Sequence, residues 1–185
     1  MKKKYEPRYF FLVIGLLIAV ISPIFLLIFP QAIADAFHYK TDIWQVYVPG
    51  VSFVGYGIGL TFLVFAALLL FFLDIKKVSI ILSIFFVGLS LTFFYLGSQS
   101  YKSLSEDSIS YSTLLSLKEY SYSWDDVKKI NYYKGNDDEF SKYVFFFSDG
   151  NSLSLSENGY IKKLKFMIII KTEDLNIKME NFEKG

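Results

Sequence analysis

Residues 9–29 read YFFLVIGLLIAVISPIFLLIF, an apolar run without a single charged side chain. Two further charge-free runs follow at residues 51–73 and 78–97. An α-helix rises about 1.5 Å per residue, so each run is long enough to cross the roughly 30 Å hydrocarbon core of a bilayer. The sequence therefore predicts a multi-pass membrane protein, with three transmembrane helices in residues 1–97 and a polar C-terminal domain in residues 98–185.

The first run has an alternative interpretation as a secretory signal peptide. Lysines precede it, and residues 32–34 read Ala-Ile-Ala, which resembles a cleavage site. The apolar part of a signal peptide is typically only about 7 to 15 residues long, shorter than this run. Pro23 lies inside the run, but membrane helices tolerate proline. We therefore expect a spanning helix, with cleavage left open.

The distribution of lysine and arginine predicts the orientation. Residues 2–4 are lysines and Arg8 precedes the first run, while Lys76 and Lys77 separate the second run from the third. In residues 30–50 the only lysine or arginine is Lys40. Because short positively charged segments stay in the cytoplasm, this pattern predicts a cytoplasmic N-terminus and an extracytoplasmic C-terminal domain.

Composition narrows the range of functions that the chain can have. With 19 basic and 18 acidic residues the chain has little net charge, which argues against a nucleic-acid partner. It contains no cysteine, so disulfides, thiol catalysis and zinc–thiolate sites are excluded. The three runs contain no Asp, Glu, Lys, Arg or His, whereas transporters and proton relays usually need such a group at depth. We expect no cofactor, and the lipid bilayer as the first partner.

Small and aromatic residues suggest how the helices are packed and anchored. Gly55 and Gly59 lie four residues apart, which gives a small-xxx-small surface for close helix packing. Packing within the three-helix bundle is the simpler interpretation, and dimerisation is the alternative. Aromatic residues near the ends of spans are typical interface anchors, and here they are Tyr9, Trp44, Tyr47 and Tyr95.

Candidate catalytic or metal-binding residues are few. Asp35, His38 and Asp42 have side chains that bind metals, but their spacing is that of an ordinary polar loop. Asp125 and Asp126 follow Ser123, a good N-cap residue, so a structural role at the start of a helical turn explains them. The single histidine offers no pair for nucleophilic catalysis. We expect a protein that is not an enzyme.

Alternation of serine with apolar residues dominates residues 98–185. It predicts strands at 108–112, 119–124 and 152–156, and a high content of strand-favouring aromatic and branched residues predicts strands at 129–133 and 143–147. Turn residues at 135–138 and 149–150 separate the later strands and predict an antiparallel meander with one buried face. Residues 160–171 combine helical spacing with a run of isoleucines, and we favour a closing helix over a strand. The predicted fold class is α+β.

Two stretches of the tail resemble bacterial pleckstrin-homology-like domains carried by small membrane proteins. Residues 119–130 read EYSYSWDDVKKI and residues 143–150 read YVFFFSDG. The resemblance implies a strongly bent sheet closed by a C-terminal helix, with Trp124 as a core or rim anchor. It also implies a module that binds or scaffolds rather than catalyses, without naming a ligand.

Three functions remain open from the sequence. The favoured one is a non-catalytic binding or scaffolding domain at the outer membrane surface, with an envelope or membrane protein as partner. The second is an accessory or immunity-type protein that joins another membrane complex through its helices. The third is a membrane-embedded enzyme that uses the aspartates or the Asp35/His38/Asp42 loop, which the absence of a catalytic set disfavours.

Overall fold

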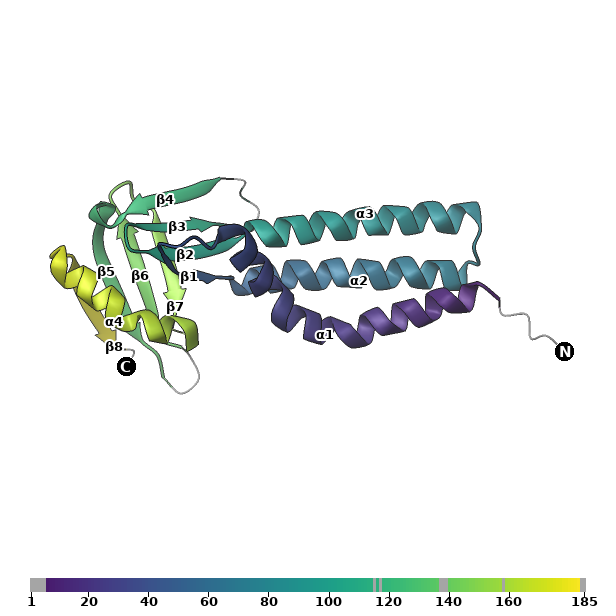
Figure 1. The fold of residues 1–185 in the computed structure, drawn as a ribbon, viewed down its shortest axis with the longest axis horizontal. Helices are drawn as coiled ribbons and strands as arrows, with labels where there is room; N and C mark the ends of the chain where they lie inside the picture. The colour runs from purple at the N-terminus through teal and green to yellow at the C-terminus, as the bar shows by residue number, and fades with distance from the viewer. Residues whose placement is uncertain (1–5, 115, 117, 137–139, 158, 184–185) are drawn as a thin grey trace. The chain divides into compact units, whose positions relative to one another are not determined.

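The computed structural model describes residues 6–114, 116, 118–136, 140–157 and 159–183. It is an α+β protein with three long apolar helices, two small sheets and a C-terminal helix, as Figure 1 shows. The chain divides into two compact units. The helical unit comprises Met1–Phe37, Val48–Tyr101 and Thr113–Leu117, and the β-rich unit comprises His38–Tyr47, Lys102–Ser112 and Lys118–Gly185.

The three apolar runs are helices, as predicted. They form α1 (Arg8–His38), α2 (Gly50–Phe72) and α3 (Lys77–Gln99), and all three are long and apolar enough to cross a membrane. Helix α1 continues beyond the predicted run, with Pro23 and Pro30 inside it. The cleavage-like residues 32–34 therefore lie within a helix, where Ala34 is buried.

Each sheet has four strands. Sheet A has the order β1-β2-β3-β4 and sheet B the order β7-β6-β5-β8. All five predicted strands are present, within a few residues of the predicted ends. The bounds are β1 Ile43–Tyr47, β2 Tyr101–Ser105, β3 Ser108–Ser112, β4 Glu119–Ser123, β5 Val127–Lys134, β6 Lys142–Phe147, β7 Ser152–Ser156 and β8 Lys178–Glu183.

Two features of the sheets differ from the sequence prediction. Strand β1 comes from the segment between α1 and α2 and pairs antiparallel with β2, so the β-rich unit is not built from residues 98–185 alone. The five predicted strands pair antiparallel with their neighbours, but they are divided between two sheets rather than forming one meander, and the additional strand β8 runs parallel to β5. A helix between two strands allows such a crossover, and here α4 (Gly159–Asp174) supplies it.

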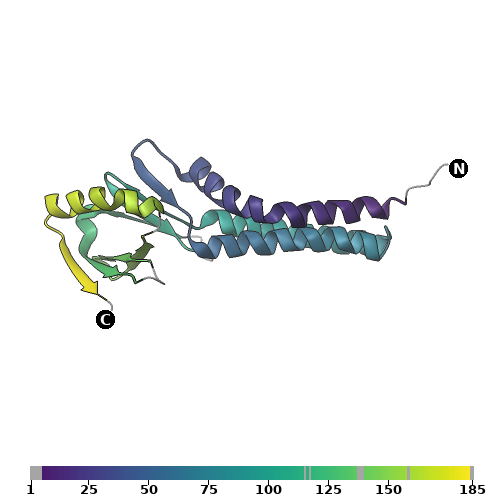
Figure 2. The ribbon, with the colours of Figure 1, turned by 90° about the horizontal axis from the view of Figure 1, so that it is seen from below.

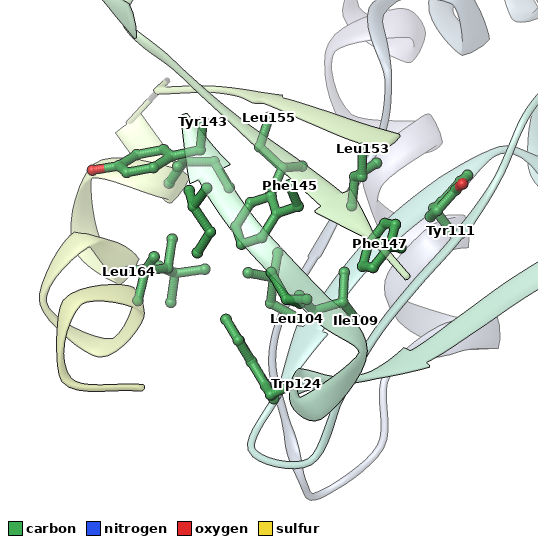
Figure 3. Packing of buried hydrophobic residues seen from close by; sticks show 14 residues of the cluster. Leu104, Ile109, Tyr111, Trp124, Tyr143, Phe145, Phe147, Leu153, Leu155 and Leu164 are labelled. Carbon is green, nitrogen blue, oxygen red and sulfur yellow. The ribbon is translucent and has the colours of Figure 1, made fainter. Parts of the chain in front are cut away.

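The β-rich unit has one apolar core (Figure 3). In β7 alternate residues point into it, so Leu153 and Leu155 are buried and the serines between them are exposed. Residues 160–171 are helical, as favoured above. Helix α4 packs Ile161, Leu164 and Ile168 into the core, and after it the chain turns back into β8 (Figure 2). The strand and turn residues of the core are Leu104, Ile109, Tyr111, Trp124, Val127, Ile130, Tyr143, Phe145, Phe147, Leu153 and Leu155.

Candidate functional site

The two predicted packing glycines lie where α2 meets α3. A Cβ atom on Gly59 would lie 2.7 Å from the ring of Phe94, and one on Gly55 would lie 3.7 Å from the Cα of Gly97. The hydroxyl of Ser83 on α3 also donates to the carbonyl of Ala66 on α2 at 2.8 Å. Both glycines therefore face α3, but only at Gly59 is the approach too close for a Cβ atom; at Gly55 a Cβ atom would make ordinary van der Waals contact.

The four aromatic residues predicted as interface anchors fall into two groups. Tyr9 and Tyr95 lie near the ends of α1 and α3 with about half of their surface exposed (49% and 57%). Trp44 and Tyr47 lie instead in β1 and are partly buried. The ring of Trp44 packs 5.7 Å from that of Trp124, so the β-rich unit holds this side chain.

The aspartates and the histidine do not assemble a site. Asp35 accepts a hydrogen bond from Gln31 one turn earlier on α1. Asp126 accepts the backbone N–H of Ser123 at 2.9 Å, the predicted capping role at the start of the 3₁₀ turn Trp124–Asp126. Within the described part of the chain, no group of three or more His, Asp or Glu is placed to hold a metal ion.

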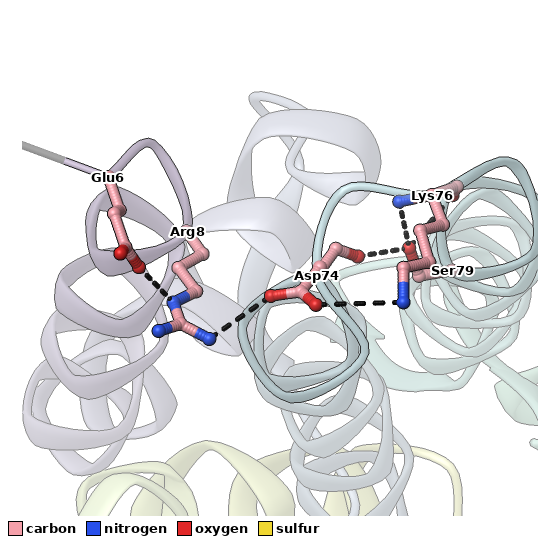
Figure 4. A network of polar contacts seen from close by, with 5 residues as sticks. All are labelled: Glu6, Arg8, Asp74, Lys76 and Ser79. Atoms are coloured by element: carbon pink, nitrogen blue, oxygen red, sulfur yellow. Dashed lines mark hydrogen bonds and ion pairs between the residues drawn. The ribbon is translucent and has the colours of Figure 1, made fainter.

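A polar network joins the start of α1 to the α2–α3 turn in the helical unit (Figure 4). Arg8 contacts Glu6 at 2.6 Å and Asp74 at 3.1 Å. Asp74 has φ 53°, and its carbonyl accepts a hydrogen bond from Ser79 at the start of α3. Lys76 lies 3.7 Å from the Asp74 carboxylate. These contacts fix the turn and tie α1 to it.

In the β-rich unit both tryptophans of the chain form one anchor. Trp124 is buried, and its indole N–H donates to the carbonyl of Ser105 at 3.0 Å. Trp44 from β1 covers the ring of Trp124. Nearby, Lys171 of α4 forms an ion pair with Glu106, and its hydrogen bond is the main cause that lowers the pKa of Glu106. The anchor thus fastens the strand that precedes α2 to the rest of the unit.

A second polar cluster locks the β6–β7 hairpin to β4. The Tyr122 hydroxyl donates to the Asp149 carboxylate at 2.7 Å and accepts a hydrogen bond from the Asn151 side chain at 2.7 Å. The hydrogen bond from Tyr122 lowers the pKa of Asp149. Behind it, the rings of Tyr122 and Phe147 stack 3.9 Å apart. These polar groups satisfy one another, so the cluster is a structural lock.

Lys102 links the two sheets. Its ammonium group, on β2 of sheet A, donates to the carbonyl of Ser154 on β7 of sheet B at 2.6 Å. Burial lowers the pKa of Lys102. A charged side chain at a strand edge hinders pairing with a further strand. Lys102 therefore places a positive charge beside the edge strand β7, in addition to linking the two sheets.

The outer strand of sheet B at the other end is different in character. Strand β8 contributes no residue to the buried core, and its side chains are exposed or half-buried. It is held to β5 by backbone pairing, by ion pairs from Lys129 to Glu180 and from Lys134 to Glu183, and by stacking of Phe182 on Tyr133. Sequence reasoning missed this strand because its charged residues hide the alternation that marks a strand.

Comparisons with known proteins add no relative. No family model matches the chain, and no curated protein and no solved structure matches it either. Fold and sites together define the class: a chain with three apolar helices of membrane-spanning length and an α+β unit whose sheets end in open-edged strands.

Proposed function

We propose that this protein is a membrane-anchored, non-catalytic binding module. The observation that carries the proposal is that a β-rich unit with its own apolar core and with edge strands is joined in one chain to three helices of membrane-spanning length. Strands β4 and β8 end their sheets, and unpaired strand edges are templates for an extended segment of another protein. The helices hold this recognition unit at a membrane surface.

The way the chain enters the β-rich unit supports anchoring. Only Val48 and Pro49 separate β1 from α2, and only Ser100 separates α3 from β2. Strands β1 and β2 pair with each other, which supports an α2–α3 hairpin whose two ends emerge on the same side of a membrane. Two crossings achieve this, and α1 adds a third.

The pleckstrin-homology-like resemblance is part of the proposal. A first sheet of β1 to β4, a second sheet that begins with β5 to β7, and a helix that packs on both fit the expectation of a bent sheet closed by a C-terminal helix. Trp124 occupies the predicted core position. The α2–α3 hairpin would then be an insertion between the first two strands of such a domain.

The charge pattern favours an extracytoplasmic β-rich unit. Arg8, Lys76 and Lys77 lie at the end of the helical unit that carries the α2–α3 turn, and positively charged ends stay in the cytoplasm. The β-rich unit is on the opposite ends of α2 and α3 along the chain. An envelope or membrane protein is then the expected class of partner.

Cysteine labelling in intact cells tests the orientation, because the natural chain has no cysteine. Ser152→Cys places a thiol at an exposed position of β7, and Lys77→Cys places one at the start of α3. A membrane-impermeant maleimide should label position 152 and leave position 77 unlabelled until the cells are opened. The reverse result would put the β-rich unit in the cytoplasm. Proximity labelling from the C-terminus then tests binding, and the proposal fails if no reproducible neighbour is found.

A second candidate is association with another membrane complex through the helices. One observation favours it: an apolar hollow of about 560 Å³ lies between α1 and α2 and is lined by residues that include Ala19, Ser22 and Gly57. A Cβ atom on Gly57 meets only Leu26 at 3.9 Å, so Gly57→Leu would project a side chain into the hollow from a position with room for its first carbon. Loss of a co-purifying membrane protein in that variant would support this candidate, and unchanged co-purification would remove it.

A further inference from the structure

Strand β8 is the one strand of sheet B that the core does not need. Strands β5, β6 and β7 each contribute two or more buried apolar residues, whereas β8 contributes none and Met179 is only partly buried. Before it, Ile177 donates its backbone N–H to the carbonyl of Thr172, which anchors the chain at the end of α4. Removing residues 178–185 would therefore leave the core and α4 in place.

The contacts that hold β8 are weak in kind. The Lys129–Glu180 pair spans 4.0 Å and the Lys134–Glu183 pair 3.0 Å, with side chains between 31% and 78% exposed. Exposed ion pairs of this kind contribute roughly 0 to 1 kcal/mol each. Parallel pairing is also slightly less stable per residue than antiparallel pairing. Asn176, with φ 52°, forms the turn that leads from α4 into β8.

The strand that β8 pairs with, β5, is positively charged. Strand β5 carries Lys128, Lys129 and Lys134 and no carboxylate. Opposite it, β8 presents Glu180 and Glu183 around Phe182, which stacks 5.1 Å from Tyr133. The one basic residue of β8, Lys178, lies opposite Lys129 and forms an ion pair with Glu180 of its own strand. The β5 edge is thus complementary to an extended segment that carries an aromatic residue between two acidic ones.

We propose that the β5 edge is the docking site of the binding module for an acidic extended segment of another protein, and that β8 occupies this site as an internal competitor. The proposal rests on the proposed function and identifies its partner chemistry. Release of β8 exposes the backbone groups of β5, and the incoming strand replaces β8 in the same register. The binding affinity then depends on how often β8 is released.

A peptide with the sequence of residues 176–185 is the probe for this site. Its binding is measured by fluorescence anisotropy to the full chain in detergent and to a chain that ends at Ile177. In the full chain, β8 is tethered by three residues and competes at an effective concentration of about 1 mM or more. If the peptide binds the shortened chain with a Kd near roughly 100 µM, it should bind the full chain at least about tenfold more weakly than the shortened chain. A peptide of the same composition in scrambled order is the control.

Charge exchange tests the register. In the shortened chain, Lys129→Glu with Lys134→Glu should weaken binding of the natural peptide by about tenfold, because two weak attractions become repulsions, and a peptide with Glu180→Lys and Glu183→Lys should restore it. Equal binding of the scrambled peptide overturns the proposal. So does absence of binding by a shortened chain whose tryptophan emission and circular dichroism match the full chain. A reproducible neighbour in proximity labelling would in that case keep the binding function and move its site elsewhere.

Hydrogen exchange on the full chain provides a test that does not depend on the shortened chain folding. Amides of residues 178–183 should exchange at least about tenfold faster than amides of β6, residues 142–147, because local release of a peripheral strand costs less than opening the core. Equal protection of the two strands would show that β8 is a permanent part of the sheet and would overturn the proposal.

Discussion

The α2–α3 contact gives a sharp prediction from two glycines that lie two residues apart. A Cβ atom at Gly59 would be 2.7 Å from Phe94 and 3.2 Å from the carbonyl of Ser90, whereas one at Gly57 would meet only Leu26 at 3.9 Å. Replacing glycine by leucine improves helix propensity by up to about 1 kcal/mol at either site, so this gain cancels in the comparison. Overpacking a close-packed contact costs about 1–3 kcal/mol, and only Gly59→Leu incurs it.

We therefore expect Gly59→Leu to be less stable than Gly57→Leu by about 2 kcal/mol, a factor of roughly 30 in the unfolding equilibrium. The reporter is Ser83→Cys, a buried position on the α2–α3 contact, in the otherwise cysteine-free chain. Its reaction with a maleimide during an SDS titration in detergent follows separation of the two helices. Equal titration midpoints for the two variants, or an earlier midpoint for Gly57→Leu, would refute the packing argument.

Three further outcomes follow from the β-rich unit. Trp44→Ala should destabilise the β-rich unit by about 2 kcal/mol in a urea titration. This is below the roughly 3–5 kcal/mol lost when a fully buried tryptophan is removed, because Trp44 is only partly buried. The same change should shift the emission of Trp124 to longer wavelength. Lys102→Met keeps the apolar stem but removes the hydrogen bond to Ser154, so urea stability should fall by about 1 kcal/mol. Asp149 has a folded-state pKa lowered from 3.8 by the Tyr122 hydrogen bond, so its contribution is present above that value and is lost as pH falls through the lower folded-state pKa. The melting temperature followed by tryptophan emission should therefore drop below about pH 4, and Asp149→Asn should show a smaller drop from a lower starting value.

The local elements were readable from the chain because their causes are local. Length and apolarity fix the three helices, since a run of this kind satisfies its backbone groups only by becoming helical in a bilayer. Alternation fixes β3, β4 and β7, since side chains of a strand point to opposite faces in turn, and aromatic and branched residues indicate β6. The cap at Ser123 and Asp126 was readable for the same reason, because a capping box needs only residues three apart.

Only the tertiary structure decided which distant segments meet. Trp44 resembles a membrane-interface anchor in sequence, but pairing of β1 with β2 carries it onto Trp124. Gly55 and Gly59 form a packing motif whose partner helix the motif does not name, and the structure identifies it as α3. Strand β8 has no alternation of its own, and becomes a strand because α4 returns the chain to the lysine-bearing edge of β5. Periodicity is a property of neighbouring residues, whereas pairing partners depend on long-range packing that a single sequence does not encode locally.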